Sequence, residues 1–322
     1  MKPLKFRAVF VSKLWGGTAI ADLKKINTDG ANIGESLELS ALPGQETICV
    51  SEGYEGLTLP RLIEKYGVGL MGERILQRYG SHFPLLVKFI DACEPLSVQV
   101  HPDDALAQSL GMPFGKSEMW YVADVKPGAS LVAGFREDVD PAVFEQLLAD
   151  GTLLTKANVY NTHPGDAFYI PAGTLHSIGA GNLIIEIQQT SGATYRVYDF
   201  DRTDAQGRKR ELHVAMAKRA LNFNGRTDYH CTPQSSGSEL SAVCRSPYFS
   251  VASLCLQKPY ALSLKDIGSF VVVVCYQGAA TLIDQEGNTE TLCAGETLLV
   301  PASATMLHLT PSGKFAALLA SV

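Results

Sequence analysis

The chain has 322 residues, of which 46% are hydrophobic and 19% charged, a globular composition that excludes general disorder. Lys and Arg number 27 against 33 Asp and Glu, and the net charge of −6 excludes the basic surface that a nucleic-acid partner or an anionic membrane would require. The length predicts one large domain or two of medium size.

Secretion, membrane insertion and disulfide bonding are not expected from this sequence. The seven cysteines include no C-x-x-C pair and their number is odd, which argues against a disulfide framework and against a thiolate zinc site. No apolar segment has the length of a signal-peptide core or a membrane span. We therefore expect a cytoplasmic protein without a membrane partner.

Helical periodicity is confined to three stretches of the chain. Residues 60–79 predict a helix with a glycine interruption, residues 140–151 a second helix with Asp140 as N-cap and Pro141 in its first turn, and residues 210–223 a third. Most of the remainder has the composition of short strands bounded by Gly, Pro, Asn or Asp, as in residues 84–90, 94–101, 118–125, 166–172, 182–189, 270–276 and 296–302. Many short strands without a βαβ alternation favour a barrel or jelly roll over a Rossmann-type sheet.

A weak internal repeat indicates two similar β units. Residues 165–176 (GDAFYIPAGTLH) and 295–306 (GETLLVPASATM) align without gaps as glycine, acid, small residue, three large apolar residues, Pro, Ala and a small residue. The first copy ends in His176 and fits the pattern Gly-x5-Pro-x-Gly-x2-His of the cupin barrels, whereas the second has Met306 at that position. We predict a mainly β protein of two cupin-like (jelly-roll) β-barrels with a few inserted helices. Residues 1–230 would form the catalytic unit with helical insertions, and residues 231–322 a C-terminal unit that lacks metal ligands.

Two strands supply partners for His176. Residues two apart in a strand share a face, so Ser97, Gln99 and His101 point one way while the intervening valines point the other. The same rule places Lys116 beside Glu118 on the next strand. The candidate metal ligands are two imidazoles, one carboxylate and one amide oxygen, from His101, Glu118, His176 and Gln99.

This nitrogen and oxygen donor set suits a borderline divalent metal, zinc first, with iron, manganese or cobalt as alternatives. The competing interpretation is that these histidines are ordinary hydrogen-bonded side chains. We adopt that interpretation for the histidines without comparable context, His82, His163, His213, His230 and His308.

A further polar pair lies in the segment of residues 182–198. Glu186 and Gln188 share one face of a strand whose other face is apolar, and Arg196 follows in the next segment. An unpaired glutamate in such a strand would be costly to bury. Glu186 is therefore either ion-paired, with an arginine as the expected structural partner, or used for acid–base chemistry, and the sequence does not decide between the two.

The blocks around these residues resemble the type I phosphomannose isomerases, most closely their short bacterial form. The resemblance rests on residues 84–104 (PLLVKFIDACEPLSVQVHPDD), 115–121 (GKSEMWY), 164–181 (PGDAFYIPAGTLHSIGAG) and 186–202 (EIQQTSGATYRVYDFDR), and on shorter pieces at 13–17 and 34–36. One departure is Leu37, where the family often has an aromatic residue. The last 90 residues match only as a generic second cupin.

The resemblance implies an aldose–ketose isomerase that interconverts D-mannose 6-phosphate and D-fructose 6-phosphate through a cis-enediol, with one Zn²⁺ per chain. It implies metal ligands at His101, Glu118 and His176, with Gln99 as a fourth in longer members. It also implies an active-site arginine at Arg196, a site lysine at Lys116, and phosphate contacts from Lys88 and Ser97. The base that moves the C2 proton is either Glu186 or Lys116.

Two other functions fit the residues less well. Two histidines and a carboxylate also describe a non-haem iron oxygenase, but dioxygen chemistry does not require Lys116 and Arg196 beside the metal. A non-catalytic sugar-phosphate-binding cupin would not need every expected ligand. The expected small-molecule partner is a sugar phosphate, and the oligomeric state is not readable from the sequence.

Overall fold

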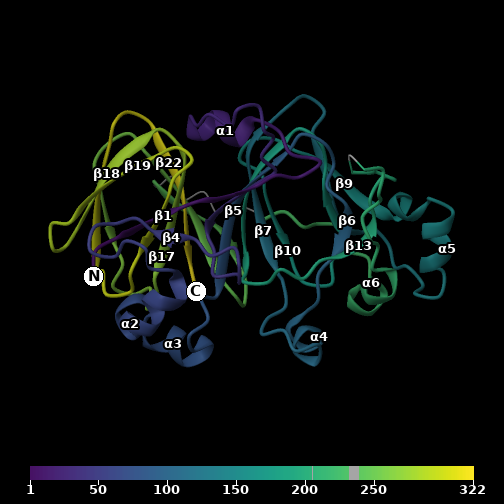
Figure 1. The fold of residues 1–322 in the computed structure, drawn as a ribbon, viewed down its shortest axis with the longest axis horizontal. Helices are drawn as coiled ribbons and strands as arrows, with labels where there is room; N and C mark the ends of the chain where they lie inside the picture. Colours follow the sequence, from purple (N-terminus) through teal and green to yellow (C-terminus); the bar gives the residue numbers. More distant parts are fainter. Residues whose placement is uncertain (205, 232–238) are drawn as a thin grey trace.

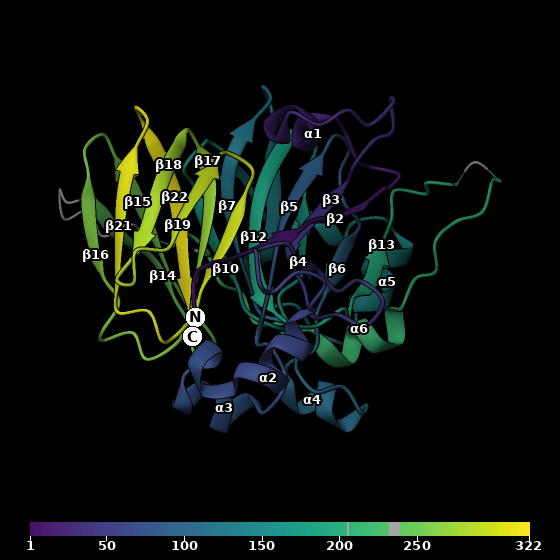
Figure 2. The same cartoon turned by 60° about the vertical axis from the view of Figure 1, so that its left-hand side comes forward.

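Four β-sheets, each assembled from antiparallel pairs, are stacked as layers in this computed structural model (Figures 1 and 2). The structure describes residues 1–204, 206–231 and 239–322. The prediction of a mainly β, jelly-roll type of fold is confirmed, although the sheets are open and do not close into barrels. No helix in the described ranges is long and apolar enough to cross a membrane.

The predicted catalytic unit contains two of the sheets. The six-stranded sheet has the order β10 (Ala167–Ile170), β7 (Glu118–Val125), β12 (Asn182–Gln189), β5 (Leu85–Ala92), β3 (Glu35–Leu39) and β2 (Val9–Val11). The five-stranded sheet has the order β13 (Tyr195–Tyr198), β6 (Val98–Val100), β11 (His176–Ile178), β8 (Ser130–Phe135) and β9 (Ala157–Asn161).

The other two sheets contain the strands of the predicted C-terminal unit, together with two strands from the N-terminal part of the chain. The seven-stranded sheet has the order β14 (Leu240–Arg245), β15 (Ser250–Leu256), β22 (Phe315–Ser321), β17 (Val271–Gln277), β20 (Thr297–Val300), β1 (Leu4–Arg7) and β4 (Ile48–Cys49). The four-stranded sheet has the order β16 (Tyr260–Ser263), β21 (Met306–Pro311), β18 (Ala279–Asp284) and β19 (Thr289–Cys293). Strands β1 and β4 come from the N-terminal part of the chain, so that part pairs into the C-terminal sheet; the division at residues 230 and 231 stays a prediction.

Strand β12 separates two cores by its alternating side chains. Its Ile185 and Ile187 belong to a core that also contains Val272 and Leu318 of the seven-stranded sheet. Ile184, on the opposite face, packs in a separate core between the six- and five-stranded sheets. Because the period of a strand is two, Glu186 and Gln188 share the face of Ile184, which is the side that holds the site described below.

The helices lie at the ends and edges of the sheets. Their bounds are α1 (Ala19–Lys24), α2 (Leu59–Met71), α3 (Glu73–Tyr79), α4 (Asp104–Ser109), α5 (Phe144–Ala149) and α6 (Val214–Ala220), with a 3₁₀ turn at Leu153–Lys156. The predicted helix over 60–79 and its glycine interruption are confirmed, because Gly72, with φ of 85°, separates α2 from α3. Helices α1 and α4, of 6 residues each, were not predicted.

The two other predicted helices are shorter than expected. Asp140 does not cap a helix: its side chain accepts from the Ala142 amide in a turn, and α5 begins only after Val143. The helix predicted over 210–223 begins after His213, whose backbone N–H donates to the Arg196 carbonyl at 2.7 Å. This hydrogen bond to β13 (Tyr195–Tyr198) keeps the residues before His213 out of the helix.

Candidate active site

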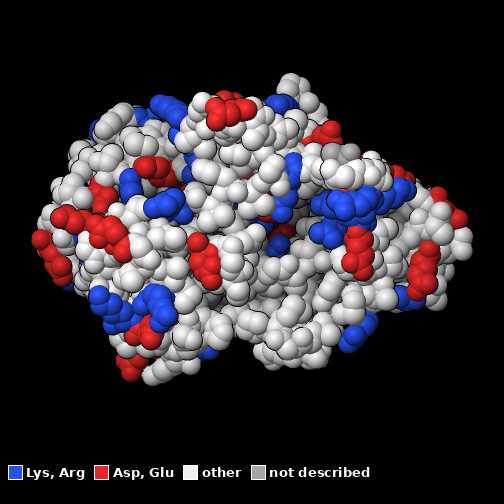
Figure 3. Space-filling view, viewed as in Figure 1, with Lys and Arg blue, Asp and Glu red and all other residues white. Residues whose placement is uncertain are grey.

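A cavity between the six-stranded and five-stranded sheets collects most of the predicted polar residues. It is lined by Lys13, Trp15, Glu35, Lys88, Ile90, Leu96, Ser97, Gln99, Lys116, Trp120, Ile178, Glu186, Thr194, Arg196 and Arg210. Figure 3 shows a hollow in this face of the molecule, with charged side chains of both signs inside it and a cluster of Lys and Arg at one rim.

Strand register explains why these side chains meet. In the six-stranded sheet, Glu186 lies opposite Lys88 on one side and Trp120 on the other. In the five-stranded sheet, Gln99 lies opposite His176 on one side and Arg196 on the other. Directly opposed residues in a sheet have side chains on the same face, so two short rows of polar groups line the cavity.

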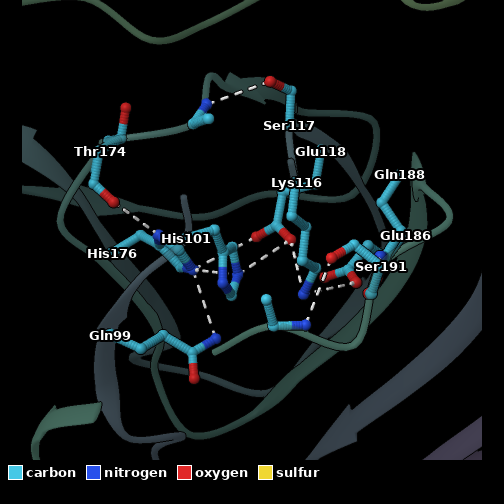
Figure 4. A network of polar contacts seen from close by, with 12 residues as sticks. Gln99, His101, Lys116, Ser117, Glu118, Thr174, His176, Glu186, Gln188 and Ser191 are labelled. Carbon is cyan, nitrogen blue, oxygen red and sulfur yellow. Dashed lines mark hydrogen bonds and ion pairs between the residues drawn. The ribbon is translucent and has the colours of Figure 1, made fainter. Parts of the chain in front are cut away.

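His101, Glu118 and His176 form a buried cluster that could hold a metal ion (Figure 4). One ligand atom from each lies within 4.8 Å of the others. The two Nε2 atoms are 3.1 Å apart, and each lies 3.3 to 3.4 Å from an oxygen of Glu118. His176 Nδ1 is 2.8 Å from the carbonyl of Thr174, so that nitrogen carries the proton and Nε2 presents its lone pair to the cluster.

The protonation states of the cluster suit a cation. Burial, aided by the neighbouring Lys116, lowers the pKa of His101 to about 3, and burial also lowers the pKa of His176. Burial would raise the pKa of Glu118, but Lys116 and the two imidazoles lower it well below its usual value. Among the described residues, neither carboxylate oxygen of Glu118 has a hydrogen-bond donor in good geometry. Neutral imidazoles and an ionised, incompletely satisfied carboxylate are the forms that bind a divalent metal, so the residues fit such an ion.

Gln99 lies next to this cluster. Its amide nitrogen is 3.3 Å from His176 Nε2, and its oxygen accepts from the Ser97 hydroxyl at 3.2 Å. Rotation of the amide by half a turn would present the oxygen to the cluster instead, and the two orientations are close to isosteric. A metal-ligand role for Gln99 stays a prediction.

Glu186 is ion-paired, but its partners are lysines and not the arginine that the sequence suggested. Its Oε1 lies 2.9 Å from Lys88 Nζ and 3.9 Å from Lys116 Nζ, while its Oε2 accepts from the Trp120 indole nitrogen at 2.8 Å. Lys88 also pairs with Glu35 at 3.2 Å. Burial would lower the pKa of Lys88, but Glu186 and Glu35 raise it, so this buried amine is held in its charged form.

Lys116 connects the metal cluster to the Glu186 group. Its Nζ lies 3.1 Å from Glu118 Oε2, as the spacing of two in the sequence predicted. The two candidates for the catalytic base, Glu186 and Lys116, therefore face the same cavity within 3.9 Å of each other.

Several residues of the cavity were not singled out from the sequence. Trp120 and Glu35 lie in blocks that carry the family resemblance but were not predicted to line the site, because their contacts with Glu186 and Lys88 depend on register between strands far apart in the chain. Arg210 was assigned to a helix, yet it lies in the cavity lining. The five histidines that we interpreted as ordinary side chains lie outside the metal-binding cluster found among the described residues.

Comparisons with known proteins agree with this site. Residues 4–128 match the family model described as phosphomannose isomerase type I, catalytic domain. The chain is 33% identical over 290 residues to a mannose-6-phosphate isomerase of Bacillus subtilis, covering 88% of this chain and 89% of that protein. It is 37% identical to a mannose-6-phosphate isomerase of Streptococcus mutans over 78% of each chain.

Solved structures give the same result for the fold. A crystal structure of the mannose 6-phosphate isomerase from Bacillus subtilis superposes with a TM-score of 0.90 at 29% identity, covering 100% of both chains. A putative mannosephosphate isomerase from Archaeoglobus fulgidus superposes with a TM-score of 0.82 at 25% identity, covering 100% of this chain and 99% of that one.

Proposed function

The chain belongs to the type I phosphomannose isomerase family, and from that premise we propose that it interconverts D-mannose 6-phosphate and D-fructose 6-phosphate with the help of one Zn²⁺. The observation that carries the proposal is the buried cluster of His101, Glu118 and His176 with Lys116 beside it. These three side chains would hold the metal, with Gln99 as a fourth ligand. Zinc is favoured because two imidazoles and a carboxylate are a common zinc set.

The reaction moves a proton between C1 and C2 of the open-chain sugar through a cis-enediol, and negative charge passes between the two oxygens. When bound, the metal supplies Lewis-acid stabilisation of that charge. Arg196, which lies beside Gln99 in the same sheet as His176, supports the same charge, because it has no carboxylate partner among the described residues and its guanidinium is a fixed cation.

Proton transfer is assigned to Glu186 or Lys116. Glu186 is held on three sides, by Lys88, Trp120 and Lys116, so a carboxylate in that position is fixed in direction. Lys116 is nearer to the metal cluster and lies against Glu118. Measuring exchange of the C2 proton with solvent in E186Q and K116M separates them, since loss of the base abolishes the exchange while loss of a positioning group only slows it.

The remaining assignments follow from the resemblance. Lys88 and Ser97 line the same cavity and are carried forward as substrate-binding residues. Residues 1–230 would act as the catalytic unit and residues 231–322 as a structural unit, since Met306 stands in β21 where the first unit has a histidine ligand.

The test is chelation and reconstitution. Treatment with a chelator should abolish formation of fructose 6-phosphate from mannose 6-phosphate, and added Zn²⁺ should restore it. Activity that persists in a protein shown by elemental analysis to be free of metal would refute the proposal. Binding of mannose 6-phosphate without turnover by a zinc-loaded protein would identify a binding module instead.

A further inference from the structure

Two arginines share the buried carboxylate of Asp199 beside the outer end of the active-site cavity, and a third, Arg196, lines the cavity with Arg210. Arg210 donates from Nε and from one terminal nitrogen to the two oxygens of Asp199, at 2.7 and 2.5 Å. Arg202 donates to the same carboxylate at 2.5 Å. Arg196 has no acidic partner; it makes a long contact of 3.5 Å with the Glu211 carbonyl, and its Nε is buried without an acceptor in the described part of the chain.

The charges at this end of the cavity are therefore not balanced. The three guanidiniums carry three positive charges and Asp199 one negative charge, which leaves an excess of two. The nearby carboxylate of Glu211 does not cancel this excess at short range, because its side chain is 83% exposed to solvent. Burial lowers the pKa of Arg196, and the nearby positive charge of Arg210 lowers it further.

At the inner end of the cavity, by contrast, the positive and negative side chains balance. Its three lysines are each matched by a buried or nearly buried carboxylate: Lys13 by Glu35 at 3.1 Å, Lys88 by Glu186 at 2.9 Å and Lys116 by Glu118 at 3.1 Å. Apart from the metal, whose charge would be used on the oxygens of the reacting carbons, an added dianion placed there would meet as many negative charges as positive ones. At the outer end it would meet an uncompensated positive field.

A row of neighbouring residues connects the outer end of the cavity to the metal cluster. Arg196 is opposite Gln99 in the β13–β6 pairing, and Gln99 contacts His176. Asp199 follows β13 directly and holds Arg210 at the rim, where its side chain is 27% exposed. The order from metal to solvent is therefore His176, Gln99, Arg196 and Arg210.

We propose that Arg210, oriented by Asp199, binds the phosphate of the substrate, while Arg196 lies between that phosphate and the reacting carbons. The proposal rests on the proposed isomerase function and adds a residue to its site. Asp199 occupies two of the five N–H donors of Arg210 and fixes the plane of the guanidinium; the remaining donors have no acceptor among the described residues and can reach phosphate oxygens. On this assignment, Lys88 keeps Glu186 in place and reaches the sugar, and the dianion is bound by arginine.

The test compares R210Q with R208Q as a matched control. Arg208 lies two residues away, 74% exposed, and pairs with Asp204 at the surface. In R210Q the KM for mannose 6-phosphate and the inhibition constant of inorganic phosphate should each rise at least about tenfold, because a charge-assisted hydrogen bond is lost, while kcat stays within about threefold. R208Q should leave both constants unchanged, and R210K should lie between wild type and R210Q.

Asp199 is a positioning residue in this account. D199N should raise the KM and the phosphate inhibition constant with little change in kcat or in zinc content, and D199E should recover part of the loss. A fall in kcat at constant KM in D199N would instead indicate a general structural role and would contradict the assignment.

Failure of this proposal and failure of the proposed function can be told apart. An active wild type whose KM and phosphate inhibition are unaffected by R210Q would overturn the phosphate site and leave the isomerase assignment standing. If the wild type shows no isomerase activity, calorimetric titration with inorganic phosphate still decides: weaker binding to R210Q than to R208Q supports the site, and equal binding overturns it.

Discussion

The hydrogen bond from Trp120 to Glu186 offers a quantitative test of how the site is held together. Trp120 is 1% exposed, and its indole nitrogen donates to Glu186 Oε2 at 2.8 Å. Replacement of Trp120 by Phe removes that donor and part of the ring. The chain contains a matched control, because Trp15 is 4% exposed, packs in the same core and lines the same cavity, yet its indole nitrogen has no hydrogen-bond partner among the described residues.

The difference between W120F and W15F isolates the hydrogen bond. Both substitutions remove the same indole volume from one core, so the packing cost is common to the two variants to first order. A hydrogen bond to a charged group contributes about 1.5 to 3 kcal/mol net, and a buried carboxylate that loses a donor keeps its desolvation cost. W120F should therefore be less stable than W15F by about 2 kcal/mol.

The measurement is urea unfolding followed by circular dichroism in the presence of a chelator, so that metal binding does not contribute to stability. Isomerase assays with zinc should show a lower kcat in W120F and nearly normal kcat in W15F, because of the two tryptophans only Trp120 donates a hydrogen bond to Glu186. Equal stability of the two variants to within about 0.5 kcal/mol, with equal kcat, would refute the idea that this bond fixes Glu186.

The remaining predictions concern the metal, the arginine and the buried ion pairs. H176A should lose bound zinc, so that a chelator lowers the melting temperature of the wild type and leaves that of H176A unchanged; an equal shift in both would contradict the ligand assignment. R196A should keep its zinc and lose kcat by about 100-fold or more, which assays and elemental analysis on one sample can check. Burial opposes ionisation of Glu35, but Lys88 and Lys13 lower its pKa from 4.5 to about 2, so the wild type should lose up to about 3 kcal/mol as the pH falls from about 4.5 towards 2. Metal-free E35Q should show much less of this acid-dependent loss in urea midpoints, and an unchanged pH profile would argue against the ion pair. K88M should destabilise the protein by about 3 kcal/mol, since the buried carboxylate of Glu186 and the partly buried one of Glu35 lose their cation, and a near-neutral effect on the urea midpoint would contradict that charge balance.

Strand periodicity predicted much of the site because each relevant strand has one polar and one apolar face. Val98 and Val100 pack in the core outside the cavity, which leaves Gln99 directed inward, as the alternation required. The same rule placed Lys116 beside Glu118. These side chains are two residues apart in one strand, so their shared direction can be predicted from the sequence alone.

Contacts between strands distant in the chain could not be predicted in this way. That Glu186 would meet Trp120 and Lys88 depends on the register of β12 with β7 and β5, and nothing in the separate segments specifies that register. The prediction that Arg210 begins a helix was wrong for a related reason. The helical pattern of its segment is overridden by Asp199 and by the backbone tie between His213 and Arg196, both of which are tertiary contacts.

The most direct test of the central claim, that the cluster of His101, Glu118 and His176 binds the one zinc ion needed for isomerisation, is a zinc titration of metal-free protein. The rate of fructose 6-phosphate formation from mannose 6-phosphate is measured at each step, with bound zinc determined on the same samples. The account predicts a rate of zero without metal and a linear rise that stops at one zinc per chain, with no rise in H176A. Full activity without metal, or the same titration curve in H176A, would contradict it.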